Sequence, residues 1–149
     1  MNAFYGEYKY LIDEKNRIFI PSKFREALKG EKKDYFMVTI GMDKCLYIFL
    51  PSKWDELISN NMSIFKAENK EEERAFKRFF FSNAADCYVD EQGRMLINSN
   101  HKIYAELKKE IVIIGVGNKA EIWDAQNWLK YANTKIKKAT NKFGKILEI

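Results

Sequence analysis

"LIDEKNRIFIP", residues 11–21, is followed later in the chain by a second stretch of the same pattern, "YVDEQGRMLIN", residues 88–98. Each copy carries Asp-Glu, then two further residues and an Arg, and each continues into a short apolar run. A doubled motif predicts an internal repeat. An internal repeat determines the architecture, because both copies form the same structural unit.

The residue types in each copy predict one tight turn. An Asp at the start of a loop can accept hydrogen bonds from backbone amides two or three residues later, so Asp13 and Asp90 are predicted to shape the two loops. Asn16 and Gly93 directly precede the arginines, and Asn and Gly best tolerate a positive φ. We therefore expect both loops to adopt the same backbone conformation.

The flanking sequence repeats as strand, charged loop, strand, short helix, two strands and a closing helix. The first short helix is expected to begin with Ser22 as its cap and to end before Gly30. The first closing helix should be capped by Ser52, and the second short helix by Ser99 or Asn100. A half of about 50 residues is marginal for an independent core. The two halves should therefore interlock into one pseudo-symmetric body of the α+β class.

Three units are expected along the chain: a first repeat at 7–54, a second repeat at 83–126 and a basic C-terminal helix at 127–149. The joining segment, "KAENKEEERAFKRFFFSNAAD", predicts a helix with a charged face and three phenylalanines turned inward, namely Phe76, Phe79 and Phe80. The segment has no Pro/Gly/Ser-rich linker, which argues against two freely tethered domains.

The C-terminal segment has an apolar residue at every third or fourth position: Leu129, Ala132, Ile136, Ala139, Phe143 and Ile146. This spacing places them on one face of a helix, with lysines on the other faces. We expect the helix to pack on the body with its basic face in solvent. The alternative is an arm that contacts phosphates or bridges subunits.

The net charge of +5 is confined to this segment. Residues 130–149 contain six lysines and one glutamate, whereas residues 1–129 contain 20 basic and 20 acidic side chains. Bulk charge therefore does not indicate that the body binds nucleic acid, and any such function depends on where individual basic residues lie.

Other residue types exclude several classes of function. Cys45 and Cys87 occur without a CxxC motif and are predicted to be reduced core residues. His101 is the only histidine, which excludes zinc sites and triads that need several histidines. No apolar run reaches the length of a transmembrane helix, and we see no signal peptide, so a cytoplasmic protein is expected.

The two arginines are the strongest functional signal. A structural turn explains the Asp and the Asn or Gly, but it does not require Lys15 beside Arg17, nor a second arginine at Arg94. A guanidinium fork at a rigid loop suits phosphate, or the O6 and N7 acceptors of guanine in a major groove.

The chain resembles the MraZ family almost from end to end. The resemblance rests on four stretches: "EYKYLIDEKNRIFIPSKFREAL", "GMDKCLYIFLPSKWDEL", "RFFFSNAADCYVDEQGRMLI" and "VIIGVGNKAEIWD". It implies tandem SpoVT-AbrB-like modules that form a pseudo-two-fold, swapped-hairpin, double-psi barrel, mainly β with short helices. It also implies a ring-shaped homo-oligomer and a nucleoid-associated transcriptional regulator, expected to repress. Such a regulator binds double-stranded DNA at promoter repeats upstream of the division and cell-wall gene cluster.

Carried over to this chain, the resemblance places Asp13 and Arg17 in the first DNA-contacting loop and Asp90 and Arg94 in the second, with Lys15 supporting Arg17. It implies no cofactor, no metal, no small-molecule substrate and no membrane partner. The second half departs from the pattern: Asn98 stands where the first half has Pro21, and Lys102 where it has Arg25. Asn16 and Asn83 occupy positions where the family prefers glycine.

Two rival functions remain. The first is an antitoxin-like or scaffold protein that uses the same fold and grips a protein partner with its C-terminal helix. The second is an enzyme that uses Asp13 with Glu14, and Asp90 with Glu91, as acid–base pairs. Adjacent exposed carboxylates lack the desolvation that separates the pKa values of an acid–base pair, so no enzymatic activity is expected.

Overall fold

The computed structural model describes residues 4–61 and 69–148. The first half contains β1 (Glu7–Leu11), β2 (Arg17–Phe19), α1 (Ser22–Gly30), β3 (Tyr35–Ile40), a 3-10 turn (Met42–Lys44), β4 (Leu46–Phe49) and α2 (Pro51–Glu56), which continues as a π-helical turn (Leu57–Asn61). Helix α3 (Lys70–Ser82) leads into β5 (Ala85–Tyr88), β6 (Arg94–Leu96), α4 (Ser99–Tyr104), β7 (Glu110–Gly115) and β8 (Ala120–Asp124). The chain ends in α5 (Ala125–Tyr131), a π-helical turn (Ala132–Ile136) and α6 (Lys137–Leu147). The α+β class is confirmed.

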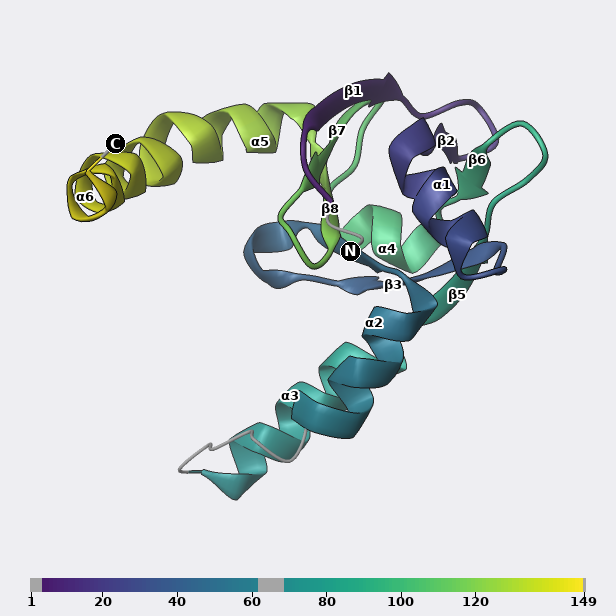
Figure 1. The fold of residues 1–149 in the computed structure, drawn as a ribbon, viewed down its shortest axis with the longest axis horizontal. Coiled ribbons are helices and arrows are strands. Elements are labelled where there is room, and N and C mark those ends of the chain that lie inside the picture. Colours follow the sequence, from purple (N-terminus) through teal and green to yellow (C-terminus); the bar gives the residue numbers. More distant parts are fainter. Residues whose placement is uncertain (1–3, 62–68, 149) are drawn as a thin grey trace.

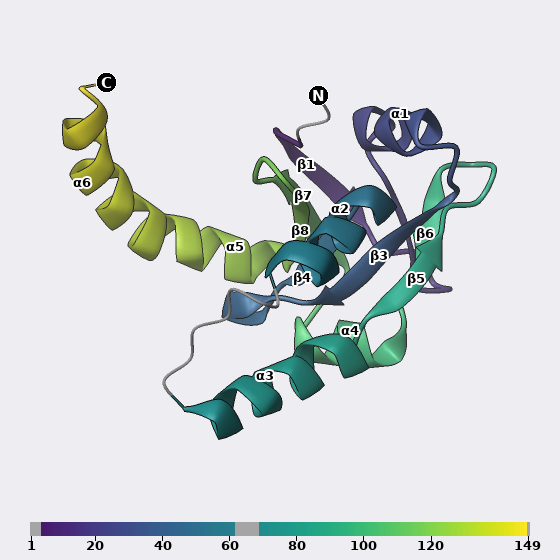
Figure 2. The ribbon, with the colours of Figure 1, turned by 60° about the horizontal axis from the view of Figure 1, so that its bottom comes forward.

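Strands of the two halves are interleaved within one antiparallel sheet, in the order β1-β7-β8-β4-β3-β5. Strand β1 of the first half pairs with β7 of the second, and β5 of the second half pairs with β3 of the first. Strands β4 and β8 pair at the centre. Figures 1 and 2 show the resulting single body. Each half supplies strands that the other half needs, so neither completes this sheet alone.

The expected barrel is not closed, and this part of the prediction is wrong. In the described residues the six-stranded sheet is open, with β1 and β5 at its edges, while β2 and β6 form a separate two-stranded ribbon. The two charged loops at 12–16 and 89–93 carry the chain away from each edge strand. Strands β2 and β6 consequently pair with each other instead of extending the sheet.

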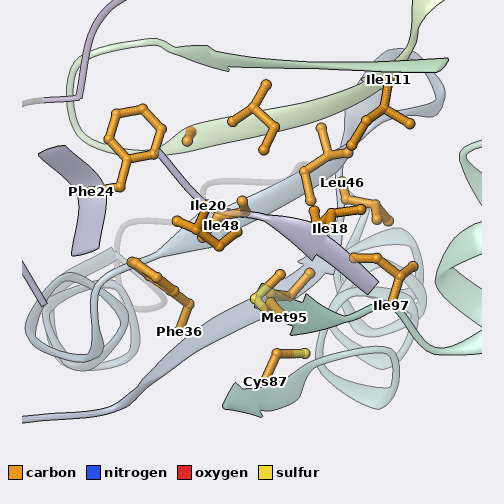
Figure 3. Packing of buried hydrophobic residues seen from close by; sticks show 14 of the residues in the cluster. Ile18, Ile20, Phe24, Phe36, Leu46, Ile48, Cys87, Met95, Ile97 and Ile111 are labelled. Atoms are coloured by element: carbon orange, nitrogen blue, oxygen red, sulfur yellow. The ribbon is translucent and has the colours of Figure 1, made fainter. Parts of the chain in front are cut away.

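The main core lies between the ribbon and the sheet (Figure 3). Ile18 and Met95 occupy the middle of the two ribbon strands, and both are completely buried. They pack with side chains from the sheet and from α1, among them Phe36, Ile48 and Phe24. Full burial of such a side chain stabilises a fold by about 1.5–3 kcal/mol. The ribbon is therefore held in place by its inner face.

The predicted helix starts are shifted by one or two residues. Helix α1 includes both Ser22 and Gly30, and its N-cap is Pro21, which has no side-chain acceptor; the carbonyl of Pro21 accepts from the amides of Phe24 and Arg25. Helix α4 is capped by Asn98, whose side chain accepts from the amide of His101, and not by Ser99 or Asn100. Ser52 lies inside α2 and bonds the side chain of Glu31 instead of capping.

Helix α3 packs against α2 through aromatic rings. The rings of Trp54 and Phe80 stack with their centroids 5.7 Å apart, and Phe76 stacks on Phe80. The prediction that Phe79 also turns inward is wrong, since its side chain is 39% exposed and contacts Tyr104 on α4. Neighbouring residues on a helix point about 100° apart; here Phe80 and Phe81 both contact Trp54, whereas Phe79 turns toward α4. Residues 66–68 of the predicted joining helix lie outside the described residues.

The C-terminal helices project away from the body (Figures 1 and 2). Trp128 and Tyr131 pack against Trp123 at the base of the projection. Much of the apolar stripe is nevertheless uncovered: Leu129 and Phe143 are each 54% exposed and Ile146 is 64% exposed. The expectation that the whole helix packs on the body is therefore wrong. The helix continues in the direction that its first turn sets, and that direction leads away from the sheet.

Both cysteines are free and buried, as expected. Burial raises the pKa of the Cys45 thiol far above its usual value and that of Cys87 to about 11, so both remain protonated. His101 is also buried, and its Nε2 lies 2.6 Å from the carbonyl oxygen of Asn83. No helix in the described ranges is long and apolar enough to cross a membrane.

Candidate nucleic-acid interface

The first charged loop is organised by one carboxylate. Oδ1 of Asp13 accepts hydrogen bonds from the amides of Lys15 and Arg17, at 2.8 and 2.9 Å. Oδ2 accepts from Nε of Arg17 at 2.8 Å. The amide of Asn16 also donates to the carbonyl of Asp13, and Asn16 takes a φ of 62°. One side chain thus closes the turn and orients the guanidinium.

The second loop repeats this geometry. Oδ1 of Asp90 accepts from the amides of Gln92 and Arg94, at 2.9 and 2.8 Å, and Oδ2 accepts from Nε of Arg94 at 3.0 Å. Gly93 has a φ of 84°, in the left-handed region that its counterpart Asn16 also occupies. Two segments far apart in the sequence therefore adopt the same hydrogen-bond pattern.

These contacts keep both carboxylates ionised. The backbone amide of Arg17 has the largest effect in lowering the pKa of Asp13, and its guanidinium adds to that effect. The backbone amide of Arg94 lowers the pKa of Asp90 in the same way. Because the leading cause is a backbone amide, each Asp keeps its charge, and its hold on the turn, even without the arginine side chain.

Each guanidinium is bound at one edge only. Within the described residues the side-chain bonds of Arg17 and Arg94 run through Nε, and the two terminal nitrogens of each fork have no protein partner. The two side chains are 30% and 22% exposed. A guanidinium held at Nε keeps its terminal N–H groups for an acceptor outside the protein, and this geometry suits a planar pair of acceptors.

The register of the ribbon places both arginines on its outer face. Arg17 pairs with Leu96, and Phe19 pairs with Arg94. Alternate residues of a strand point to opposite faces and paired residues share a face, so these four side chains lie on the side opposite the buried Ile18 and Met95. Arg17 and Arg94 are diagonal neighbours, about 7–8 Å apart at Cα.

Each loop is also braced by the other half of the chain. The carbonyl of Gly93 accepts from the amide of Ile20, and the carbonyl of Asn16 accepts from the amide of Ile97, at 2.9 and 2.8 Å. The Oδ1 of Asn16 further accepts from Nζ of Lys102 on α4 at 2.7 Å. The two loops therefore form one hydrogen-bonded unit that neither half could build alone.

Arg25 on α1 is the counterpart of Lys102. The guanidinium of Arg25 packs directly on Gly93 in the second loop: a Cβ added at Gly93 would lie only 2.9 Å from Cζ of Arg25, so a larger residue would not fit without a shift of that side chain. Nε of Arg25 donates to the carbonyl of Ile20 at 3.0 Å. Sequence reasoning did not place Arg25 or Lys102 in the site. The signal that could have found them is their matching position in the repeat, where each is basic.

Lys15 lies at the exposed tip of the first loop, and Glu14 and Glu91 are exposed beside the two tips. The ribbon face therefore combines directed cations with nearby acidic residues and is not a uniformly basic patch. Among the described residues, no group of three or more His, Cys, Asp or Glu side chains is arranged to hold a metal ion.

Comparison with known proteins agrees with this doubled architecture. A family model described as "MraZ protein, putative antitoxin-like" matches the chain twice, over residues 3–79 and 80–145. The chain belongs to the MraZ family. Curated MraZ relatives match most of its length, which confirms the resemblance inferred from the sequence.

Three of these relatives illustrate the match, and each is named "Transcriptional regulator MraZ". The protein of Carboxydothermus hydrogenoformans is 45% identical over 130 residues, which cover 87% of each chain. That of Caldicellulosiruptor bescii is 46% identical over 125 residues, 84% of this chain and 83% of the relative. That of Clostridium tetani is 45% identical over 133 residues, 89% of each chain.

Proposed function

We propose that this MraZ-family protein is a DNA-binding transcriptional regulator that reads DNA with the outer face of the β2–β6 ribbon. The names of its relatives support the regulatory role. The observation that carries the proposal is the pair of guanidinium forks, Arg17 and Arg94, on one ribbon face with their terminal nitrogens unbound. A major groove admits a two-stranded ribbon, and an arginine fork matches O6 and N7 of guanine.

The surrounding residues have supporting roles in this proposal. Asp13 and Asp90, with Asn16 and Gly93, hold the loops in shape so that the forks are preorganised. Lys15 contacts a phosphate beside the first fork, since it is exposed at the loop tip. This function needs no cofactor, metal or small-molecule substrate.

We further propose that residues 7–54 and 83–126 are two AbrB-type, swapped-hairpin repeats of double-psi topology. The reciprocal pairing of β1 with β7 and of β5 with β3 supports this division. The target is a set of repeated promoter sites upstream of the division and cell-wall gene cluster, where binding represses transcription. A protein bound there resides in the cytoplasm on the nucleoid.

Self-association into a ring completes the proposal. The C-terminal segment, in its described part 127–148, projects with an uncovered apolar stripe that a monomer leaves in water. The body offers a groove of about 520 Å³ between β1, β7 and α5, lined by apolar side chains that include Tyr10, Ile111 and Trp128. A stripe on one copy that fits a groove on the next makes a head-to-tail contact, and such contacts form a ring when the rotation between successive copies closes.

A ring would also explain how a ribbon face that binds DNA weakly on its own could give tight binding to promoter repeats. A good base contact contributes about 1–3 kcal/mol of discrimination. Repeating the ribbon around a ring presents many such faces to repeated DNA sites, and the resulting avidity can strengthen binding by about 10²–10⁴ without a new contact.

The proposal is tested by a gel-shift titration of the protein on its own upstream DNA, with a scrambled duplex of equal length as control. Preferential binding of the upstream DNA by the wild type, and its loss in Arg17→Ala, is the expected result. Light scattering on the same sample should give a mass several times 17.6 kDa. Equal affinity for both duplexes would refute sequence-specific regulation, and a monomer mass would refute the ring.

The uncovered C-terminal stripe also favours a second candidate function. An antitoxin-like or scaffold protein could hold a protein partner against Leu129, Phe143 and Ile146 while the ribbon binds DNA. The two candidates differ in what covers the stripe. A stoichiometric second protein, lost when Phe143 and Ile146 are changed to Ser, would support the antitoxin-like function. Loss of self-association in the same variant supports the ring.

A further inference from the structure

Two large apolar side chains share the outer ribbon face with the arginines, each paired across the ribbon with one of them. Phe19 is 48% exposed and Leu96 is 58% exposed. Phe19 stands directly across the ribbon from Arg94, and Leu96 stands directly across from Arg17. The same arrangement therefore occurs twice, once at each end of the ribbon, with an apolar side chain beside a guanidinium fork.

Folding does not account for these residues. The core is filled from the opposite face of the ribbon, where Ile18 and Met95 are completely buried. Among the described residues Phe19 has one aromatic neighbour, Tyr10, at a centroid distance of 6.5 Å, and about half of its surface remains in contact with water. Any polar residue of suitable β propensity could occupy an outward position of this kind. An exposed apolar pair flanked by cations indicates a binding surface.

The size and charge of the surface favour DNA over a protein as its occupant. Two side chains offer far less than the roughly 1,000 Å² that a stable protein interface buries. The guanidinium forks beside them are complementary to the negative charge of DNA. In the major groove, the apolar feature open to such side chains is the C5-methyl group of thymine.

We propose that Phe19 and Leu96 contact thymine methyl groups and thereby contribute to sequence discrimination, next to the bases that the arginines contact. This inference rests on the proposed function, because it assumes that the ribbon enters the major groove. Paired residues on one face have their Cβ atoms about 4.5–5.5 Å apart, and base pairs rise about 3.4 Å. Each apolar side chain therefore reaches a base within one or two pairs of the base at its neighbouring fork.

The test pairs a side-chain deletion with a methyl deletion. Binding of fluorescently labelled upstream DNA is measured by anisotropy, first with thymine and then with deoxyuridine at every thymine, which removes only the C5-methyl groups. Wild-type protein should bind the deoxyuridine duplex about three- to tenfold more weakly. The Phe19→Ala, Leu96→Ala double variant should bind both duplexes equally, at the affinity that the wild type shows for deoxyuridine DNA.

Val116→Ala is the matched control, because Val116 is 42% exposed and lies outside the ribbon. This variant should retain the full wild-type preference for thymine. Thermal unfolding and light scattering of all variants accompany the titrations. Since Phe19 and Leu96 project outward, the double variant should keep its fold and its mass.

Three outcomes would overturn the inference. Equal binding of both duplexes by the wild type, with Arg17→Ala still abolishing specific binding, leaves the proposed function intact but removes the methyl contact. A double variant that loses mass while keeping its thymine preference shows that Phe19 and Leu96 form a protein contact. Failure of the wild type to prefer its upstream DNA over a scrambled duplex overturns the proposed function itself.

Discussion

Replacing Arg17 with Ala should weaken binding to promoter repeats without unfolding the protein. The side chain contributes one of three hydrogen bonds to Asp13, while the amides of Lys15 and Arg17 itself contribute the other two. The ion pair is partly exposed, with side chains 30% and 36% accessible, so its loss should have little effect on folding stability. The turn should therefore persist, and only the fork should be lost.

The expected effect on binding is larger. Loss of a bidentate contact to a base costs about 1–3 kcal/mol, which corresponds to an increase in Kd of roughly 5- to 150-fold. Arg94→Ala should act in the same direction but less strongly, because Lys15 supports only the first loop. Arg74→Ala, an exposed arginine on α3, is the charge-matched control and should change Kd by less than about twofold.

The assay is a fluorescence titration at fixed salt on duplexes with matched and scrambled repeats, combined with thermal unfolding of each variant. The reasoning would be refuted if the Arg17→Ala, Arg94→Ala double variant, folded as the wild type, still bound the matched repeats at wild-type concentrations. The two loops would then be structural turns alone. The DNA site would have to be sought among the lysines of the C-terminal helix.

Three further predictions follow from other parts of the structure. Changing Lys135, Lys138 and Lys142 to Gln should flatten the dependence of log K on log salt by up to about 0.9 per lost phosphate contact, while the ratio of matched to scrambled affinity stays constant. Gly93→Ala should lower the free energy of unfolding by about 1–2 kcal/mol in denaturant titrations, because Gly93 has a φ of 84° and the new Cβ would meet Arg25. Gly30→Ala is the contrasting variant: a Cβ there would have no atom within 4 Å, so it should stabilise α1 by about 0.5–1 kcal/mol. Burial lowers the pKa of His101 below its ordinary value of 6.5, so the unfolded chain binds a proton more readily than the folded protein does. The stability that neutral, buried His101 contributes is therefore complete above pH 6.5 and is lost as the pH falls below that value. The wild-type Tm should accordingly fall more between pH 7.5 and 5.5 than that of His101→Gln, and equal falls would contradict this account.

Several features followed from the sequence because local chemistry determines them. The spacing from Asp to Arg, together with Asn16 or Gly93 at the left-handed position, predicts the turn that both loops adopt. These contacts lie within four residues, so no distant part of the chain is needed to infer them. The α+β class and the buried, free cysteines followed in the same way from periodicity and composition.

The first residue of each helix was harder to predict from the sequence, although helix capping is also a local interaction. Asn98 caps α4 in place of Ser99, and Pro21 opens α1 without any side-chain cap. Neighbouring polar residues compete for the cap position, and which of them becomes the cap depends on where the preceding strand ends. In both halves that strand belongs to the ribbon, whose position is set by tertiary packing.

The tertiary structure alone determined the arrangement of the candidate surface. The pairing of β2 with β6 places Arg17 and Arg94 on one face, buries Ile18 with Met95 and exposes Phe19 with Leu96. This pairing joins residues almost eighty positions apart, and a slip of one residue would exchange the two faces. The braces from Arg25 and Lys102 likewise cross between the halves. Sequence periodicity can identify two similar loops, but only long-range packing brings them together as one site, because the contacts that do so lie between the repeats and not within either of them.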